Sequence, residues 1–158
     1  MSAAPQQKLS LQQRKYIQQH KDSPDFIGYQ DKIRGIVGSN VEVEIDWASV
    51  EQGLLTDTYE NMYLNNGNNI KEWFLLNLEE GMKLTCQDKM AKEAVQETIK
   101  KIILRHASSP ELKIENGVFI VAASLHGGGS YDKESIKSFI ISINILSVIF
   151  KGHLHHCF

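Results

Sequence analysis

The chain has 158 residues, of which 42% are hydrophobic and 23% are charged, and its formal net charge is −2. This length fits one domain, and the hydrophobic content is too high for an intrinsically disordered chain. The Lys and Arg residues form no basic stripe of the kind that neutralises nucleic-acid phosphates. We therefore expect a folded domain that does not bind nucleic acid.

The sequence also indicates the cellular compartment in which the protein is expected. Its two cysteines, Cys86 and Cys157, lie far apart, and the first ten residues contain no apolar core of a secretory signal. The apolar stretch from Ile136 to Phe150 is interrupted by three serines and an asparagine and is shorter than the roughly 20 residues of a membrane span. We expect a cytoplasmic protein that does not contact membranes.

Composition divides the chain into three parts. Residues 1–22 are polar and Gln-rich and predict a peripheral arm, in which Ser10 and Gln13 have the spacing of a capping box. Residues 23–150 predict a single α+β domain. Residues 151–158 predict a His-rich C-terminal tail, and chain ends of this kind are commonly untied.

The first elements of the domain have clear signals. Ser23 and Pro24 predict a helix start, and Gly38 predicts its end. From Val41 to Trp47 apolar and acidic residues alternate strictly, which predicts a strand with one face on the core and one in water.

The middle of the chain is predicted to be mainly loop and helix. Turn residues predict a loop region from Ala48 to Asn69, with turns at Gly53 and at 65–69 and a short helix from Thr58 to Leu64. A helix with Ile70, Trp73, Phe74 and Leu78 on one face is expected to end at Gly81. A long helix should then begin at the capping pair Thr85 and Asp88 and carry an apolar stripe to about His106.

The last elements complete the fold class. Asn116-Gly117 is the dipeptide of a type I′ turn, so the flanking segments 112–115 and 118–122 predict a β-hairpin. Asp132 can cap a final helix over 136–150, although the isoleucines there would also suit a strand. The strands are few and grouped, which predicts an α+β fold with a small, mostly antiparallel sheet and helices packed against it.

Three carboxylates are the main candidate binding residues. Glu42, Glu44 and Asp46 share one face of the predicted strand. Such a row could hold a divalent cation, supply an acid and a base, or dock a basic partner. The same alternation is also found on any strand that is solvated on one side.

Histidines and cysteines give weaker candidates. His153, His155, His156 and Cys157 are ligand types for zinc or copper, but they lack the loop separation of structural zinc sites. Cys86 is expected in the first turn of the long helix, where the helix dipole could lower the thiol pKa, but a buried, inert cysteine is the better interpretation because the sequence has no C-x-x-C motif. The loop His126-Gly127-Gly128-Gly129 resembles an esterase oxyanion loop, yet the sequence has no G-x-S-x-G motif.

These observations leave two main hypotheses. The first is a non-enzymatic protein-binding or regulatory module of the adaptor, inhibitor or immunity type that acts through a surface. The alternative is an enzyme or metal-dependent protein whose site combines the strand carboxylates with His126 or the terminal histidines. A third hypothesis is a homo-oligomer, based on the apolar final segment. The sequence identifies no cofactor.

Overall fold

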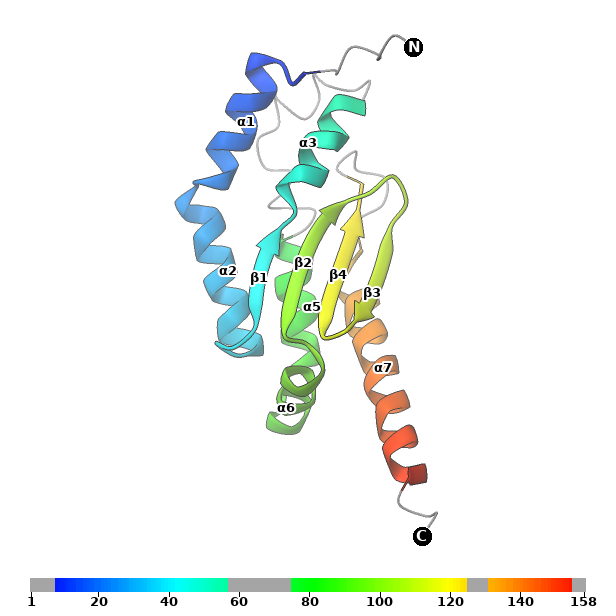
Figure 1. The fold of residues 1–158 in the computed structure, drawn as a ribbon. Helices are drawn as coiled ribbons and strands as arrows, with labels where there is room; N and C mark the ends of the chain where they lie inside the picture. Colours follow the sequence, from blue (N-terminus) through cyan, green and yellow to red (C-terminus); the bar gives the residue numbers. More distant parts are fainter. Residues whose placement is uncertain (1–7, 57–74, 125–130, 155–158) are drawn as a thin grey trace, which may run out of the picture.

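The computed structural model describes residues 8–56, 75–124 and 131–154, which form a mixed β-sheet with helices packed against it (Figure 1). The predicted α+β class is confirmed. The elements follow in the order α1 (Leu11–Lys21), α2 (Pro24–Val37), β1 (Glu42–Ile45), α3 (Trp47–Thr56), α5 (Leu76–Thr85), α6 (Lys89–Thr98), β2 (Lys101–His106), β3 (Glu111–Glu115), β4 (Val118–Ala123) and α7 (Lys133–Leu154).

The sheet has the strand order β1-β2-β4-β3. β1 pairs with β2 and β2 with β4 in parallel, and only the β3–β4 pair is antiparallel. The prediction of a mostly antiparallel sheet is therefore wrong. The sequence pattern places β2 in a helix, and the sheet is mostly parallel because both pairings of this strand are parallel.

The long helix predicted from Thr85 to His106 is in fact two helices and a strand. Thr85 ends α5, and its hydroxyl donates to the carbonyl oxygen of Gly81 at 2.8 Å instead of capping a following helix. Asp88 does cap α6, because its carboxylate accepts from the backbone N–H of Ala91 at 2.8 Å. After Thr98 the β-branched run favours an extended chain, and pairing on both sides buries β2 in the sheet.

Two glycines predicted to mark chain breaks lie inside helices. Gly53 is part of α3, so the predicted loop from Ala48 does not begin there. Gly81 does not end a helix but lies within α5, where a Cβ atom would come within 2.8 Å of Ile136 in α7. The expected helix at 58–64, the turns at 65–69 and residues Ile70, Trp73 and Phe74 lie outside the described residues.

The local signals of the other elements are confirmed. The Ser23 hydroxyl accepts from the backbone N–H of Phe26 at 3.2 Å and begins α2. Asn116 and Gly117 have φ of 51° and 79°, as a type I′ turn requires. Asp132 accepts from the backbone N–H of Ser135 at 2.7 Å, and the segment that follows is the helix α7.

The hydrophobic core lies on one face of the sheet. α2, α5 and α7 pack on that side, and Figure 1 shows α5 and α7 behind the strands. The ring of Phe119 stacks on that of Phe139 in α7, with ring centres 5.8 Å apart. The inward residues of β1, β2 and β4 are buried, whereas those of the edge strand β3 are half-buried. The buried set consists of Val43, Ile45, Ile102, Leu104, Phe119, Val121 and Ala123.

The first helix is joined to this core. Tyr16 and Ile17 of α1 are each 6% exposed, and the side-chain amide of Gln13 donates to the carbonyl oxygen of Leu54 in α3 at 2.9 Å. The division at residues 22 and 150 stays a prediction, although α1 packs on the domain and α7 continues to Leu154. Within the described ranges no helix is both long and apolar enough to cross a membrane.

We expect Gly81→Ala to destabilise the fold by about 1–3 kcal/mol, because the added methyl group would overlap Ile136 where α5 meets α7. Gly28→Ala in α2 is the matched control, since a Cβ atom there meets nothing within 4 Å. It should stabilise the protein by about 0.5–1 kcal/mol through helix propensity. Urea unfolding measures both changes, and equal effects would contradict the close α5–α7 contact.

The docking of α1 should appear as a pH dependence of stability. Burial raises the pKa of Tyr16 from 10.0 to about 12, so its contribution is complete below pH 10 and is lost as the pH rises from 10 to 12. Between pH 8 and pH 11 this group should lose about 1.4 kcal/mol of unfolding free energy. In Tyr16→Phe that part of the loss should vanish. An equal loss in both proteins would show that Tyr16 is not buried.

Candidate functional site

The second face of the sheet has no described helix over it and is seen from the front in Figure 1. The strand register places Ile103 of β2 beside Ile120 of β4 in its centre, and both are half-buried. Charged residues of β1, β2 and β3 surround them. We call this surface the open face and define it by Glu42, Glu44, Lys101, Ile103, Arg105, Glu111, Lys113, Glu115, Val118 and Ile120.

Two of the predicted carboxylates point out from β1 onto this face, as the alternation of the sequence indicated. Glu42 and Glu44 are exposed, but both lie beside a cation on the next strand. The ammonium of Lys101 is 2.9 Å from the carboxylate of Glu44 and 3.5 Å from that of Glu42. The hydrogen bond to Glu44 raises the pKa of Lys101. The trio carries a net charge of −1.

The third carboxylate, Asp46, has a different role from the other two. It precedes α3 and accepts from the backbone N–H of Ser49 and from the guanidinium Nε of Arg105, each at 3.1 Å. The side chain therefore joins the end of β1 to the start of α3 and to β2. Its bonds are those of a helix cap and an ion pair.

Ser49 and His106 lie beside Asp46, but their contacts differ from those of a catalytic triad. The Ser49 hydroxyl donates its one hydrogen to the carbonyl oxygen of Asp46 at 2.6 Å and accepts from the backbone N–H of His106 at 2.9 Å. The His106 ring packs on α3, where a Cβ atom at Gly53 would come within 2.3 Å of it. The hydroxyl therefore holds β2 against α3, whereas a nucleophile would donate its hydrogen to a base.

A second charged trio lies on β3. The Lys113 ammonium is 2.6 Å from the carboxylate of Glu115, and this hydrogen bond raises the pKa of Lys113. Glu111, one pleat further along, is also exposed on this face. Like the trio on β1 and β2, this group has two acids and one base. The apolar pair Ile103 and Ile120 thus lies between two trios, each of net charge −1.

Sequence reasoning missed the cations of this surface because it assigned Lys101 and Arg105 to a helix. The signal was nevertheless present, since Lys101, Ile103 and Arg105 alternate with the buried Ile102 and Leu104. A strand reading would have placed the two cations on the face that carries the acids of β1.

The environment of the Cys86 thiol disfavours the thiolate, because burial outweighs the opposite effect of Lys92 on its pKa. It lies directly after α5, as its C-cap residue, and not in the first turn of a helix, so that prediction is wrong. The side chain is half-buried, and burial raises the pKa of the thiol. A raised pKa keeps the thiol protonated at neutral pH and makes it a poor nucleophile.

Most of the histidine candidates lie outside the described residues, so their role stays a prediction. His126 and its glycine loop, and His155, His156 and Cys157, lie outside the described residues, and His153 is in the last turns of α7. Within the part of the chain that the structure describes, no group of three or more His, Cys, Asp or Glu side chains is placed to hold a metal ion.

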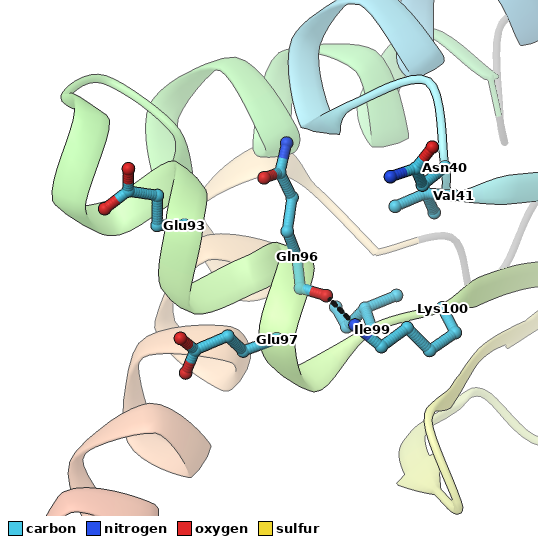
Figure 2. Close-up of a pocket in the computed structure, with 7 residues that line it drawn as sticks. All are labelled: Asn40, Val41, Glu93, Gln96, Glu97, Ile99 and Lys100. Carbon is cyan, nitrogen blue, oxygen red and sulfur yellow. Dashed lines mark hydrogen bonds between the residues drawn. The ribbon is translucent and has the colours of Figure 1, made fainter.

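A pocket of about 300 Å³ lies at the other end of the strands, between the end of α6 and the start of β1 (Figure 2). Two of its polar side chains bond to the backbone: the Gln96 amide donates to the carbonyl oxygen of Val37 at 2.7 Å, and the Lys100 ammonium donates to that of Gln96. The carboxylates of Glu93 and Glu97 point away from Asn40 (Figure 2). This pocket is a packing crevice between elements.

Comparison of the chain with protein-family models, with curated proteins and with solved structures finds no match.

Asp46→Ala should destabilise the protein by about 1–2 kcal/mol, because the start of α3 loses its cap and Arg105 loses its partner. Glu42→Ala removes a carboxylate from the same edge without removing a cap. It should change stability by no more than about 0.5 kcal/mol, since exposed ion pairs contribute little. Urea unfolding separates the two, and a neutral Asp46→Ala would show that this carboxylate does not support α3.

Proposed function

We propose that the protein is a non-enzymatic protein-binding module whose partner covers the open face of the sheet. The observation that carries this proposal is the apolar pair Ile103 and Ile120, half-exposed in the middle of a sheet face with charged residues on both sides. An apolar centre within a polar rim is the general anatomy of protein–protein interfaces.

The charges of the open face indicate the chemistry of the partner. The trio of Glu42, Glu44 and Lys101 and the trio of Glu111, Lys113 and Glu115 each carry a net charge of −1 on opposite sides of the apolar pair. A complementary surface has an apolar ridge with basic side chains on both flanks. Such complementarity contributes mainly to association rate and specificity.

The pairing of the carboxylates favours binding over catalysis. A general acid or base needs a proton-exchanging group that can reach a substrate. Glu44 is bonded to Lys101, and Asp46 is bonded to both Ser49 and Arg105. Groups held in this way shape a surface and fix its charge pattern.

The face can be tested with Ile103→Lys, which places a charge in the apolar centre. Affinity capture from an extract of the source cells, quantified by mass spectrometry, should yield partners with wild type that are reduced at least about tenfold with the variant. Met90→Lys is the matched control, since Met90 is a 78% exposed apolar residue on α6, away from the sheet. It should capture the same partners as wild type.

A gentler variant, Ile103→Thr, keeps the β-branched shape and guards against misfolding of the lysine variant. Circular dichroism and urea unfolding establish that each variant is folded. If both folded Ile103 variants capture the same proteins in the same amounts as Met90→Lys, the open face is not the binding surface. If wild type is a dimer that Ile103→Lys dissociates, the face binds a second copy and the partner proposed here is wrong.

A further inference from the structure

The two edges of the sheet differ in how far other parts of the chain cover them. At the β1 edge, the side-chain amide of Gln30 in α2 donates to the carbonyl oxygen of Val43 at 2.6 Å, so a helix side chain occupies an outward backbone acceptor. At the β3 edge every residue is exposed or half-buried. An exposed strand edge is a template for pairing with another strand unless something blocks it.

The register of the hairpin identifies the outward groups of β3. The two-residue turn makes Glu115 and Val118 a hydrogen-bonded pair, and alternate pairs follow at Lys113 and Glu111. The backbone N–H and C=O groups of Leu112 and Ile114 therefore point away from the sheet. Within the described residues, no hydrogen bond to these outward groups is found.

The side chains of β3 add a charge pattern to this edge. Glu111, Lys113 and Glu115 are exposed on the open face and read acid, base, acid along the strand. Leu112 and Ile114 lie between them and pack partly against the core on the other face. A strand that pairs here meets alternating charges on one side and an apolar margin on the other.

A second copy of the same strand fits this edge poorly. The antiparallel register that uses all outward groups pairs Leu112 with Ile114 of the second copy. That register sets Lys113 opposite its own counterpart and Glu111 opposite Glu115, and like charges directly opposite destabilise a strand pair. Moving the register toward Pro110 sets Glu111 opposite Lys113, but each copy then loses a hydrogen-bond donor, because proline has no N–H. Moving the register in the other direction pairs Leu112 with Asn116, which belongs to the turn and not to the strand.

We propose that the free edge of β3 takes up an extended segment of a partner protein with the reversed pattern: basic, apolar, acidic, apolar, basic. Its outer cations lie opposite Glu111 and Glu115, its acid lies opposite Lys113, and its apolar residues extend the margin formed by Leu112 and Ile114. Main-chain hydrogen bonds supply affinity and the alternate side chains supply specificity, as in other cases of strand addition. The site is the strand edge, so this inference stands apart from binding at Ile103 and Ile120.

The probes are two blocked peptides, Ser-Lys-Val-Glu-Val-Lys-Ser and its charge-exchanged form Ser-Glu-Val-Lys-Val-Glu-Ser. Isothermal titration with the full chain should show the first binding at least about tenfold more tightly, since three cross-strand pairs change from repulsive to attractive. Hydrogen exchange should slow at the amides of Leu112 and Ile114. The Ile103→Lys variant should bind the peptide as wild type does, which separates this site from the open face.

The reciprocal exchange tests the pairing directly. In the triple variant Glu111→Lys, Lys113→Glu, Glu115→Lys the preference should reverse, and the second peptide should bind more tightly. Methylation of the peptide nitrogens that face β3 should abolish binding to wild type. Equal affinity for the two peptides, a preference that does not reverse in the folded variant, absence of binding, or slowed exchange elsewhere than at Leu112 and Ile114 would each overturn the proposal.

Discussion

The strand β2 is the element on which the rest of the structure depends, because it separates the core from the open face and joins β1 to β4. Ile102 and Leu104 are essentially fully buried against the helices, whereas Lys101 and Arg105 emerge on the other side beside the acids of β1. Strand periodicity of two imposes this division, and a shift of one residue would bury both cations. The same alternation therefore fixes the hydrophobic core and the charge pattern of the surface.

The elements that the sequence predicted correctly are those whose signals are local. β1 lies within the alternating run from Val41 to Trp47, although it spans only Glu42–Ile45 and Trp47 already begins α3. The hairpin shows Asn116-Gly117, and α2 and α7 show a capping residue before an apolar run. β2 was missed because Val95, Thr98, Ile99 and Ile102 also match helical spacing. Its strand character depends on parallel neighbours that are distant in the chain, such as the Asp46–Arg105 pair at a separation of 59 residues. A single sequence carries no record of such pairings.

The candidate site shows the same limit at the level of side chains. Alternation predicted correctly that Glu42 and Glu44 face water, yet it did not reveal that Lys101 lies between them. Nor did it separate Asp46, whose bonds to Ser49 and Arg105 support the fold, from its two neighbours. Three carboxylates at equal spacing thus divide into surface and structural roles once β2 lies beside β1. The distinction arises from strand pairing and not from the motif.

Exposed ion pairs of this kind contribute little to stability, so their arrangement matters more for what the sheet can contact. Edge strands need features that prevent indiscriminate pairing, and charges are a common one. On β1 the Gln30 amide and the packing of α2 serve that purpose. On β3 the alternation of Glu111, Lys113 and Glu115 disfavours a like strand while leaving the outward groups of Leu112 and Ile114 accessible. In the register that uses all the outward groups, the like charges that oppose pairing with a second copy attract a strand of the opposite pattern, so protection and selectivity follow from the same three side chains.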